Sequence, residues 1–338
     1  MSSPSIYDVS KQANVSIATI SRVVNGKGKV GEKTRARVLK TIEEMGYTPN
    51  ALARGLSTNN SIKTVGLLST DSTDLYHSRA IFFLERELRK SGYDSILCCT
   101  GYDPVYHESR LKLLLSKQVD AVVLISSYYL HEDDNAYIRN ASKKVPVMMM
   151  NAAVETEGVY SFICDDRQAT CSLTTRFIEQ GRKRLVHIHH SDTFSSRQKL
   201  AGICDALDAH GLDRESLILL QCENDIHAAM RAIEKLVKDG EFFNGVICPG
   251  DGTAVGALKG LARQRIRVPE EVAVTGYNNS IIARSSSPEI TSVDNVVEDI
   301  CVAVVDGLMR LFGGEEIPRT NVFEARLVQR ESAILTKN

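Results

Sequence analysis

Residues 6–25 read Ile-Tyr-Asp-Val-Ser-Lys-Gln-Ala-Asn-Val-Ser-Ile-Ala-Thr-Ile-Ser-Arg-Val-Val-Asn, and they decide how the start of the chain folds. Apolar residues recur at helical spacing on both sides of a short polar break, which predicts two short helices. The expected buried faces are Ile6, Val9 and Ala13, followed by Ile20, Val23 and Val24. Two helices around a tight turn are typical of a helix-turn-helix, which lays its second helix in the DNA major groove.

The predicted turn is Asn14-Val15-Ser16. Asn tolerates left-handed backbone, and a Ser hydroxyl can cap the helix that follows. The outward face of the second helix carries small side chains and one arginine: Ile17, Ala18, Ser21, Arg22 and Asn25. An ordinary helical hairpin is the alternative, but such a face suits a DNA groove better than bulk water.

Charge is concentrated at this end of the chain. The whole sequence holds 41 basic and 42 acidic residues, so its total charge indicates nothing about nucleic acid. Residues 1–61 hold nine Lys or Arg against four acids, a balance of +5, which leaves 32 against 38, or −6, for the rest. A basic module on an acidic body concentrates attraction for DNA phosphates in the module.

Composition narrows the class of protein. A chain of 338 residues has room for two or three domains, and 43% apolar with 25% charged residues is ordinary for a globular protein. No apolar run approaches the roughly 20 residues that span a bilayer, and the first five residues do not read as an export leader. The eight cysteines form no C-x-x-C pattern. We therefore expect a cytoplasmic protein with reduced thiols and no membrane contact.

A third helix is predicted over Glu32–Met45, with Gly46 ending it and Val38, Ile42 and Met45 packing on the first two helices. Residues 50–56, Asn-Ala-Leu-Ala-Arg-Gly-Leu, can form two helical turns, and 57–61 are a polar linker. Isolated helices below roughly 12 residues are marginal in water. We therefore expect a hinge that becomes helical only on a partner.

From residue 62 onward, short apolar runs alternate with amphipathic helices in two successive series. Strands are expected at 64–68, 95–99, 121–125 and 145–150, and again near 185–189, 217–221, 245–248 and 272–276. This alternation predicts an α/β core of two doubly wound parallel sheets, with ligands at the carboxyl ends of the strands. A late helix near 296–312 and strands near 290–294 and 322–327 are expected to tie the two lobes together.

The whole chain resembles the LacI-type family of bacterial transcription repressors. The segments that carry the resemblance are 6–9, 15–25, 46–56, 274–277 and 327–332. The resemblance implies a helix-turn-helix domain (1–48), a hinge helix and linker (49–61) and a periplasmic-binding-protein-like core (62–338). Its lobes are expected at 62–160 plus 293–320 and at 161–292 plus 321–338.

The resemblance also assigns roles in DNA binding. Ile17, Ala18 and Arg22 occupy base-reading positions, where Arg22 would fork onto a guanine and the other two would meet thymine methyls. Phosphate contacts are implied for Tyr7, Ser16, Thr19, Ser21, Asn25 and Thr34. The hinge residues Asn50, Ala53 and Leu56 are implied at the minor groove, where Leu56 would wedge into a central base step. Gly31 stands where the family usually has a capping Ser before the third helix.

Candidate effector ligands lie at strand ends of the core: Asp71, Tyr76, Asp165 (or Asp166), Arg197, Asp251 and Asn278. Arg197 resembles the cleft arginine of the family. Two departures from the family pattern weaken a sugar assignment. Asn278-Asn279 replaces the usual Asp-Asp, and the aromatic residue often found near 222–225 is missing from a chain that has no Trp. The ligand is therefore a sugar or another small polar metabolite, an acidic compound, or absent.

Other functions are less well supported. A metal site is one interpretation of the histidines at 187, 189 and 190. Only Asp192 lies near enough in the sequence to complete a set of ligands, so we expect no metal and no cofactor. No G-x-S-x-G, phosphate loop or H-E-x-x-H motif suggests an enzyme. A transporter-linked solute-binding protein would share the core but not residues 1–61. A core that answers to a protein partner, instead of a small ligand, remains open.

The mechanism expected from these features is a homodimer on a pseudo-palindromic DNA operator. DNA would order both hinge helices, and closure of the lobes on an effector would shift the dimer interface and release them. Only six residues follow Ser332, too few for a heptad tail, which favours a dimer over a tetramer.

Overall fold

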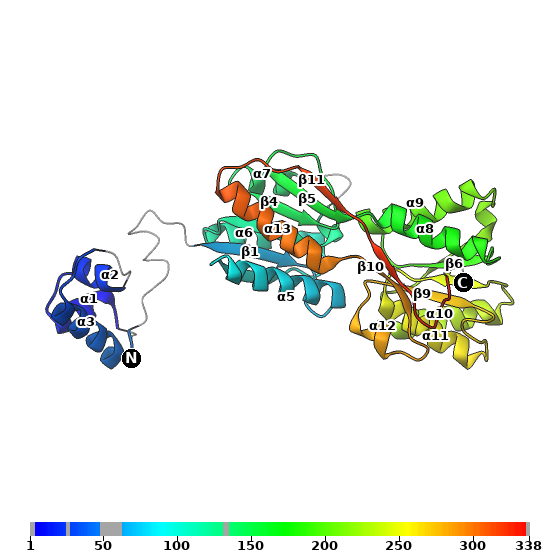
Figure 1. The fold of residues 1–338 in the computed structure, drawn as a ribbon, viewed down its shortest axis with the longest axis horizontal. Coiled ribbons are helices and arrows are strands. Elements are labelled where there is room, and N and C mark those ends of the chain that lie inside the picture. The colour runs from blue at the N-terminus through cyan, green and yellow to red at the C-terminus, as the bar shows by residue number, and fades with distance from the viewer. Residues whose placement is uncertain (1–3, 25–27, 48–62, 131–134, 336–338) are drawn as a thin grey trace. The chain divides into compact units, whose positions relative to one another are not determined.

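The computed structural model describes residues 4–24, 28–47, 63–130 and 135–335 (Figure 1). The chain divides into two compact units, residues 1–62 and 63–338. Within the described residues, no helix combines the length and the apolar character needed to cross a membrane.

The described residues of the N-terminal unit form three helices: α1 (Ile6–Ala13), α2 (Ile17–Val24) and α3 (Glu32–Met45). Their shared core consists of the buried Val9, Ala13, Ile20, Val23 and Val38, with Ile6, Val24, Ile42 and Met45 packed around it. These are the side chains predicted from helical spacing. The predicted bounds of α3 are also confirmed, since Gly46 ends it with a left-handed backbone (φ 60°).

The second unit is built on two six-stranded sheets, which confirms the predicted doubly wound architecture. The first sheet has the order β11-β5-β4-β3-β1-β2, and all its pairs are parallel. Its strands are β1 (Thr64–Ser69), β2 (Asp94–Cys99), β3 (Ala121–Ile125), β4 (Val147–Met150), β5 (Val159–Cys164) and β11 (Thr320–Phe323). We call the part of the chain around this sheet the N-lobe.

The second sheet has the order β12-β10-β9-β8-β6-β7, in which only β12 runs antiparallel to its neighbour. Its strands are β6 (Leu185–His189), β7 (Leu217–Gln221), β8 (Gly245–Ile247), β9 (Ala273–Tyr277), β10 (Thr291–Asp294) and β12 (Arg326–Val328). The part of the chain around it is the C-lobe.

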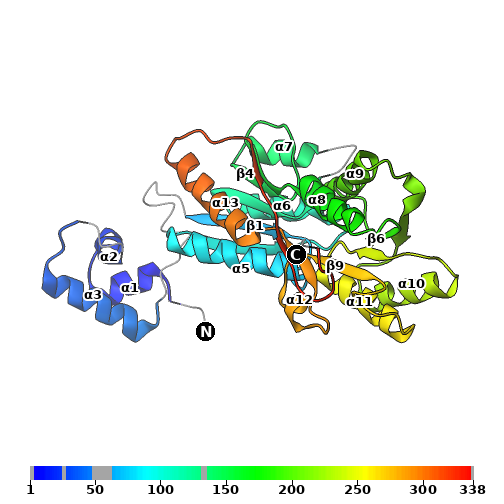
Figure 2. The ribbon, with the colours of Figure 1, turned by 45° about the vertical axis from the view of Figure 1, so that its right-hand side comes forward.

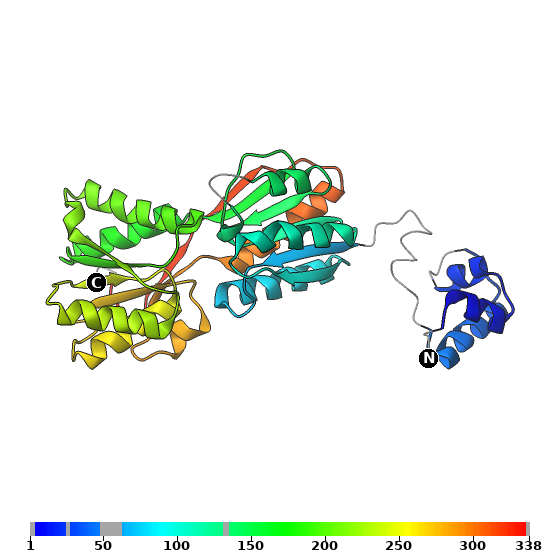
Figure 3. The same ribbon diagram turned by 180° about the vertical axis from the view of Figure 1, so that it is seen from behind.

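Helices cover both faces of each sheet. In the N-lobe, α5 (Leu75–Lys90) and α13 (Val297–Phe312) share one core, whereas α6 (Pro104–Ser116) and α7 (Ala136–Ser142) pack on the opposite face, seen from behind in Figure 3. In the C-lobe, α8 (Asp166–Glu179) and α9 (Phe194–Ala209) lie opposite α10 (Ile226–Lys238), α11 (Asp251–Arg263) and α12 (Ile281–Ser285), as Figure 2 shows. Short 3-10 turns lie at Ser127–Tyr129 and Arg214–Ser216.

The lobe boundaries predicted from the sequence need correction. Strand β5 pairs with β4 and β11, so the N-lobe extends through residue 164 and also includes 320–323. Strand β10 pairs with β9, so residues 291–294 belong to the C-lobe. The predicted single strand near 322–327 is two strands, one in each lobe. Strand pairing decides these boundaries, and local hydropathy does not report which strands pair.

The chain therefore passes between the lobes three times (Figure 1). The crossovers are residue 165, residues 295–296 and residues 324–325, each between elements of different sheets. At the second crossover Val296 has φ 49°, which is costly for a β-branched residue.

Candidate functional site

Helix α2 presents the outward face that the sequence predicted. Ile17, Ala18 and Arg22 are exposed, whereas Ile20 and Val23 are buried against α1 and α3. An isoleucine held at the surface without a core to cover is available for contact with another molecule. The structure thus presents the three predicted base-reading side chains, and their reading of bases stays a prediction.

The turn before α2 has the geometry expected for it. Asn14 adopts left-handed backbone (φ 50°, ψ 52°), and the Ser16 hydroxyl accepts a hydrogen bond from the Thr19 amide at 3.2 Å. The Ser16 and Thr19 hydroxyls also lie 2.9 Å apart. This bonding anchors the first turn of α2.

Most of the residues predicted to contact DNA phosphates are described by the structure, and they differ in how exposed they are. Tyr7 is 70% exposed, and Ser16, Thr19, Ser21 and Thr34 are exposed or half-buried. Asn25, Asn50, Ala53 and Leu56 lie outside the described residues, as does the predicted hinge, 49–61. Gly31 begins α3 without a side-chain cap, as its lack of a side chain requires.

A cavity of about 780 Å³ lies between the two lobes of the core. Its N-lobe wall comes from residues within 71–77, Tyr102, residues within 126–128, and Asn151. Its C-lobe wall comes from residues within 187–199, 223–226, 249–252 and 278–280. These segments follow the carboxyl ends of parallel strands, which is where ligand sites form in doubly wound sheets. We call this space the inter-lobe cavity.

Four of the predicted effector residues line the inter-lobe cavity: Asp71, Tyr76, Asp251 and Asn278. The two others do not line it. The Asp165 carboxylate caps α8 by accepting the Gln168 amide at 3.0 Å. The Arg197 guanidinium donates to the Asp192 carboxylate at 3.1 Å, and its side chain is 40% exposed.

Lys199 is a cationic residue of the cavity wall that was not predicted from the sequence. Ser195 and Ser196 also line the cavity, and they lie four and three residues before Lys199, on the same face of α9. Arg197 is two residues after Ser195 and faces another way. This helical spacing was the signal in the sequence that identifies Lys199.

The Asp251 carboxylate is a buried group with partners in the fold. Its oxygens accept hydrogen bonds from the Ser292 hydroxyl and the Ser280 amide, both at 2.6 Å. Burial raises the pKa of Asp251, and these hydrogen bonds oppose the rise. Asp251 therefore ties the start of α11 to the start of α12 and to β10, on the cavity wall.

Three buried hydroxyls on the cavity wall have no hydrogen-bond partner among the described residues. They are the Tyr76 phenol and the hydroxyls of Ser191 and Ser280. Burial raises the pKa of Tyr76 well above its ordinary value, so its phenol stays protonated and able to donate. An unpaired buried polar group costs about 1–3 kcal/mol, so these hydroxyls favour a polar occupant.

Two histidines on the C-lobe wall, His187 and His190, are neutral at physiological pH. Burial lowers the pKa of His187 to about 4, and its Nδ1 donates to the Ile247 carbonyl at 3.1 Å. Burial, followed by the nearby Lys199 charge, lowers the pKa of His190 to about 4. Across the described residues, no three His, Cys, Asp or Glu side chains are grouped as metal ligands.

The charge balance of the cavity wall is acidic. Among the described residues, five carboxylates line it (Asp71, Asp74, Glu223, Asp225 and Asp251), against the single ammonium of Lys199. A hydrogen bond from the Thr73 amide, the largest cause, lowers the pKa of Asp71 and keeps it ionised. Such a wall repels an anion and accepts hydrogen bonds from hydroxyl groups.

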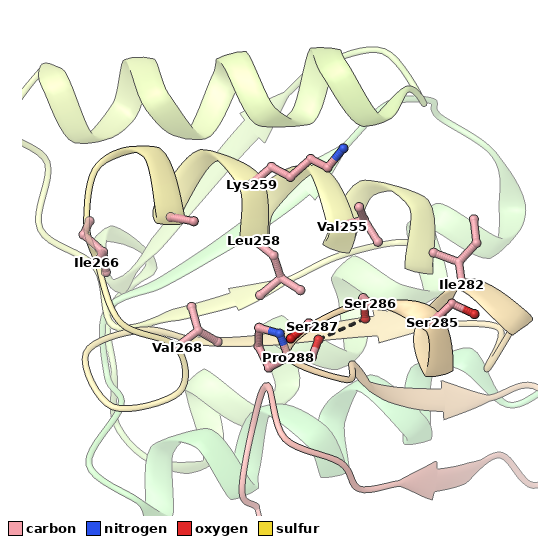
Figure 4. Close-up of a pocket in the computed structure, with 11 residues that line it drawn as sticks. Val255, Leu258, Lys259, Ile266, Val268, Ile282, Ser285, Ser286, Ser287 and Pro288 are labelled. Carbon is pink, nitrogen blue, oxygen red and sulfur yellow. Dashed lines mark hydrogen bonds between the residues drawn. The ribbon is translucent and has the colours of Figure 1, made fainter.

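A second cavity, of about 400 Å³, lies in the C-lobe alone, between α11 and the 285–288 segment (Figure 4). Its lining is mainly apolar, including Val255, Leu258, Ile266 and Val268, with Lys259 as its charged residue. This chemistry differs from the polar inter-lobe cavity and does not suit a ligand rich in hydroxyls.

Comparison with known proteins decides the family. Residues 62–317 match the model described as "Periplasmic binding proteins and sugar binding domain of LacI family", and residues 5–50 match "Bacterial regulatory proteins, lacI family". The chain belongs to the LacI family. It is a DNA-binding transcriptional regulator.

Relatives cover nearly the whole length of this LacI-family chain. An HTH-type transcriptional regulator of Lachnoclostridium phytofermentans is 41% identical over 97% of this chain and 98% of its own. Catabolite control protein A of Staphylococcus epidermidis is 30% identical over 94% and 95% of the two chains. The regulator AscG of Escherichia coli is 29% identical over 97% and 98%.

Solved structures show the same fold. The lac repressor dimer bound to operator and the anti-inducer ONPF has a TM-score of 0.87 over 98% of this chain and 99% of that chain, at 20% identity. The complex of the transcriptional regulator CelR with cellobiose has a TM-score of 0.70 over 98% and 100% of the two chains, at 27% identity.

Proposed function

We propose that this regulator is a repressor that binds a pseudo-palindromic operator as a homodimer and is controlled by a small polar ligand in the inter-lobe cavity. The observation that carries the proposal is the pairing of an exposed α2 face with a cavity that contains unpaired buried hydroxyls. One feature serves to bind DNA, and the other serves to sense a metabolite. Operator binding places the protein in the bacterial cytoplasm.

The wall chemistry favours a neutral ligand rich in hydroxyls, such as a sugar, over an acidic one. Five carboxylates and one lysine line the cavity in the part of the chain that the structure describes, and His187 and His190, whose pKa values are lowered, add no positive charge at physiological pH. A volume of about 780 Å³ is in the usual range for small-molecule sites. The related CelR, solved with cellobiose, supports this ligand class.

The homodimer is supported by an apolar patch at the edge of the N-lobe sheet. Strand β2 is the outermost strand, and exposed apolar side chains lie on it and on α6: Leu97, Val105, Tyr106 and Leu113. An uncovered edge strand with an apolar patch favours association with another chain. The dimer in the lac repressor structure supports the same arrangement here.

The DNA-binding part is tested by selecting binding sites from random duplexes with the full chain. We expect an enriched inverted repeat. Arg22→Met should weaken binding to it by about 1–3 kcal/mol and relax selectivity at one base pair of each half-site. Lys33→Met, which removes an exposed charge of the same unit outside α2, is the control that should weaken all sequences equally. Equal binding to every duplex by the unmodified chain would contradict operator recognition.

The ligand part is tested by recording melting shifts of the full chain with a library of neutral sugars and their phosphorylated counterparts. We expect stabilisation by a neutral compound, and its loss in Lys199→Met. That compound should then release the selected duplex in a titration. Stabilisation by the phosphorylated compounds alone would contradict the neutral ligand class.

A further inference from the structure

The loop after β9 places two consecutive residues in left-handed backbone. Asn278 has φ 87° and Asn279 has φ 44°. Asn is the side chain, after Gly, that tolerates this region best. Asn278 also lines the inter-lobe cavity, so the conformation of this loop shapes the wall of the ligand site.

The side chains of this loop bind the second crossover between the lobes and C-lobe residues beside it. The Asn278 carbonyl oxygen Oδ1 accepts from the Asn295 amide nitrogen Nδ2 at 2.9 Å. Asn279 Nδ2 donates to the Asp294 carboxylate at 3.0 Å, and Asn279 Oδ1 accepts from the Arg330 guanidinium at 2.6 Å. The loop therefore joins the cavity wall to the segment that connects the lobes.

The backbone of the same loop is held from the other lobe. Arg79, on α5 of the N-lobe, donates from Nη1 to the main-chain carbonyl of Asn278 at 2.8 Å and to that of Asn279 at 3.5 Å. Its guanidinium also lies 5.9 Å from the centre of the Phe83 ring on the same helix. A charged donor to a carbonyl makes a stronger bond than a neutral one.

We propose that Arg79 is a positioning residue for the ligand site, which holds the Asn278-Asn279 loop in place across the two lobes and couples its position to α5. The proposal rests on the proposed function only in assigning the inter-lobe cavity to a ligand. Helix α5 begins at the cavity wall, where Leu75, Tyr76 and His77 line it. A ligand that moves the loop therefore also loosens or tightens the hold of Arg79 on it.

Arg86 provides a matched control on the same helix. Its guanidinium lies 4.9 Å from the same Phe83 ring and bonds Glu87 at 2.7 Å and Glu298 at 2.8 Å. All of these partners belong to the N-lobe. Removing Arg86 thus perturbs α5 and α13, and among the described residues its guanidinium makes no hydrogen bond to the C-lobe loop.

The experiment measures amide hydrogen exchange in the full chain, without DNA or ligand. Three loop amides have bonds that report its order: Asn278 to the Val293 carbonyl at 2.8 Å, Asn279 to the Ser292 hydroxyl at 3.0 Å and Ser280 to Asp251 at 2.6 Å. Arg79→Met should speed their exchange at least tenfold, and Arg79→Lys should restore part of the protection. Arg86→Met should leave these three amides unchanged.

The outcomes separate this proposal from the proposed function. Unchanged loop exchange in a folded Arg79→Met protein, or equal acceleration in Arg79→Met and Arg86→Met, would overturn the positioning role. Neither result depends on a ligand or an operator. A chain that failed both the duplex selection and the sugar screen could still show faster loop exchange in Arg79→Met. A chain that passed both tests could equally show no such effect, which would overturn the positioning role alone.

Discussion

The Lys199 ammonium lies over the ring of Tyr277, with Nζ 3.8 Å from the ring centre. The Tyr277 hydroxyl donates to Asp166 Oδ1 at 2.6 Å, and the Ser195 hydroxyl donates to the other oxygen of the same carboxylate. Asp166 follows the first crossover directly. Lys199, on the cavity wall, therefore packs on a ring whose hydroxyl is bound close to the first crossover between the lobes.

Removing the Lys199 charge should change the titration of its neighbours. Lys199 contributes to the lowered pKa values of His187 and His190, after desolvation. In Lys199→Met we expect the pKa of His190 to rise from about 4 toward its ordinary value, by less than about one unit because burial is the larger cause. NMR titration of the imidazole protons measures this, with Lys199→Arg as the charge-preserving control. An unchanged pKa would show that Lys199 points away from the histidines in solution.

Stability should fall in mild acid because of His187. The unfolded chain takes up a proton near pKa 6.5, whereas the folded chain resists protonation down to about 4. The contribution is therefore fully present above pH 6.5 and is lost as the pH falls toward 4. Between about pH 7 and about pH 5 the loss is about 2 kcal/mol.

Urea unfolding of wild type and His187→Gln at these two pH values measures this contribution. On acidification from about pH 7 to about pH 5, the free energy of unfolding of the variant should fall by about 2 kcal/mol less than that of wild type. His227→Gln, at an exposed position, is the control and should retain the full pH dependence. If the stability of His187→Gln fell with pH as much as that of wild type, other groups and not His187 would cause the loss of stability in acid.

The two adjacent aspartates at the start of α8 should differ in their sensitivity to amide substitution. The Asp166 carboxylate accepts two hydroxyls, whereas Asp165 accepts the Gln168 amide as a helix cap. Asp166→Asn leaves only one carbonyl acceptor and should lower the free energy of unfolding by about 1–3 kcal/mol. Asp165→Asn should be nearly neutral, since Asn caps helices as well as Asp. Equal losses in chemical denaturation would contradict the separate roles.

The uncapped start of α3 can be improved. Gly31 has φ −59° and ψ 142°, which Ser adopts readily, and no atom lies within 4 Å of an added Cβ. Gly31→Ser supplies a hydroxyl acceptor for the Lys33 or Thr34 amide and should slow their hydrogen exchange about two- to fivefold. Gly31→Ala adds the Cβ without the hydroxyl and should give no such protection. Slowing in both variants would point to backbone stiffening instead of capping.

Much of the fold was predictable because its determinants are local. Helical spacing identified the core of the N-terminal unit, and the alternation of apolar runs with helices identified the two doubly wound sheets. The lobe boundaries were misplaced because β5 and β11 join the N-lobe sheet by pairing with distant strands. The hydropathy of a segment does not indicate with which distant strand it pairs.

The ligand site was predicted only in part for a similar reason. Asp71, Tyr76, Asp251 and Asn278 follow strand ends, and the topology brings all four to one cavity. Arg197 matched the expected residue type, but the turn of α9 directs Lys199 to the wall instead. Whether Arg197 or Lys199 faces the cavity depends on how α9 is rotated about its axis, and the sequence does not give that rotation.

The amino-acid sequence by itself determined the helix-turn-helix, the doubly wound core and the family, because periodicity and turn chemistry act over a few residues. Only the tertiary structure decided which carboxylates accept hydrogen bonds from other parts of the fold and which buried hydroxyls of the described residues have no partner. It also decided that Arg79 binds Asn278 from the other lobe. Those properties depend on distances between atoms far apart in the chain. Burial and three crossovers between two sheets set these distances.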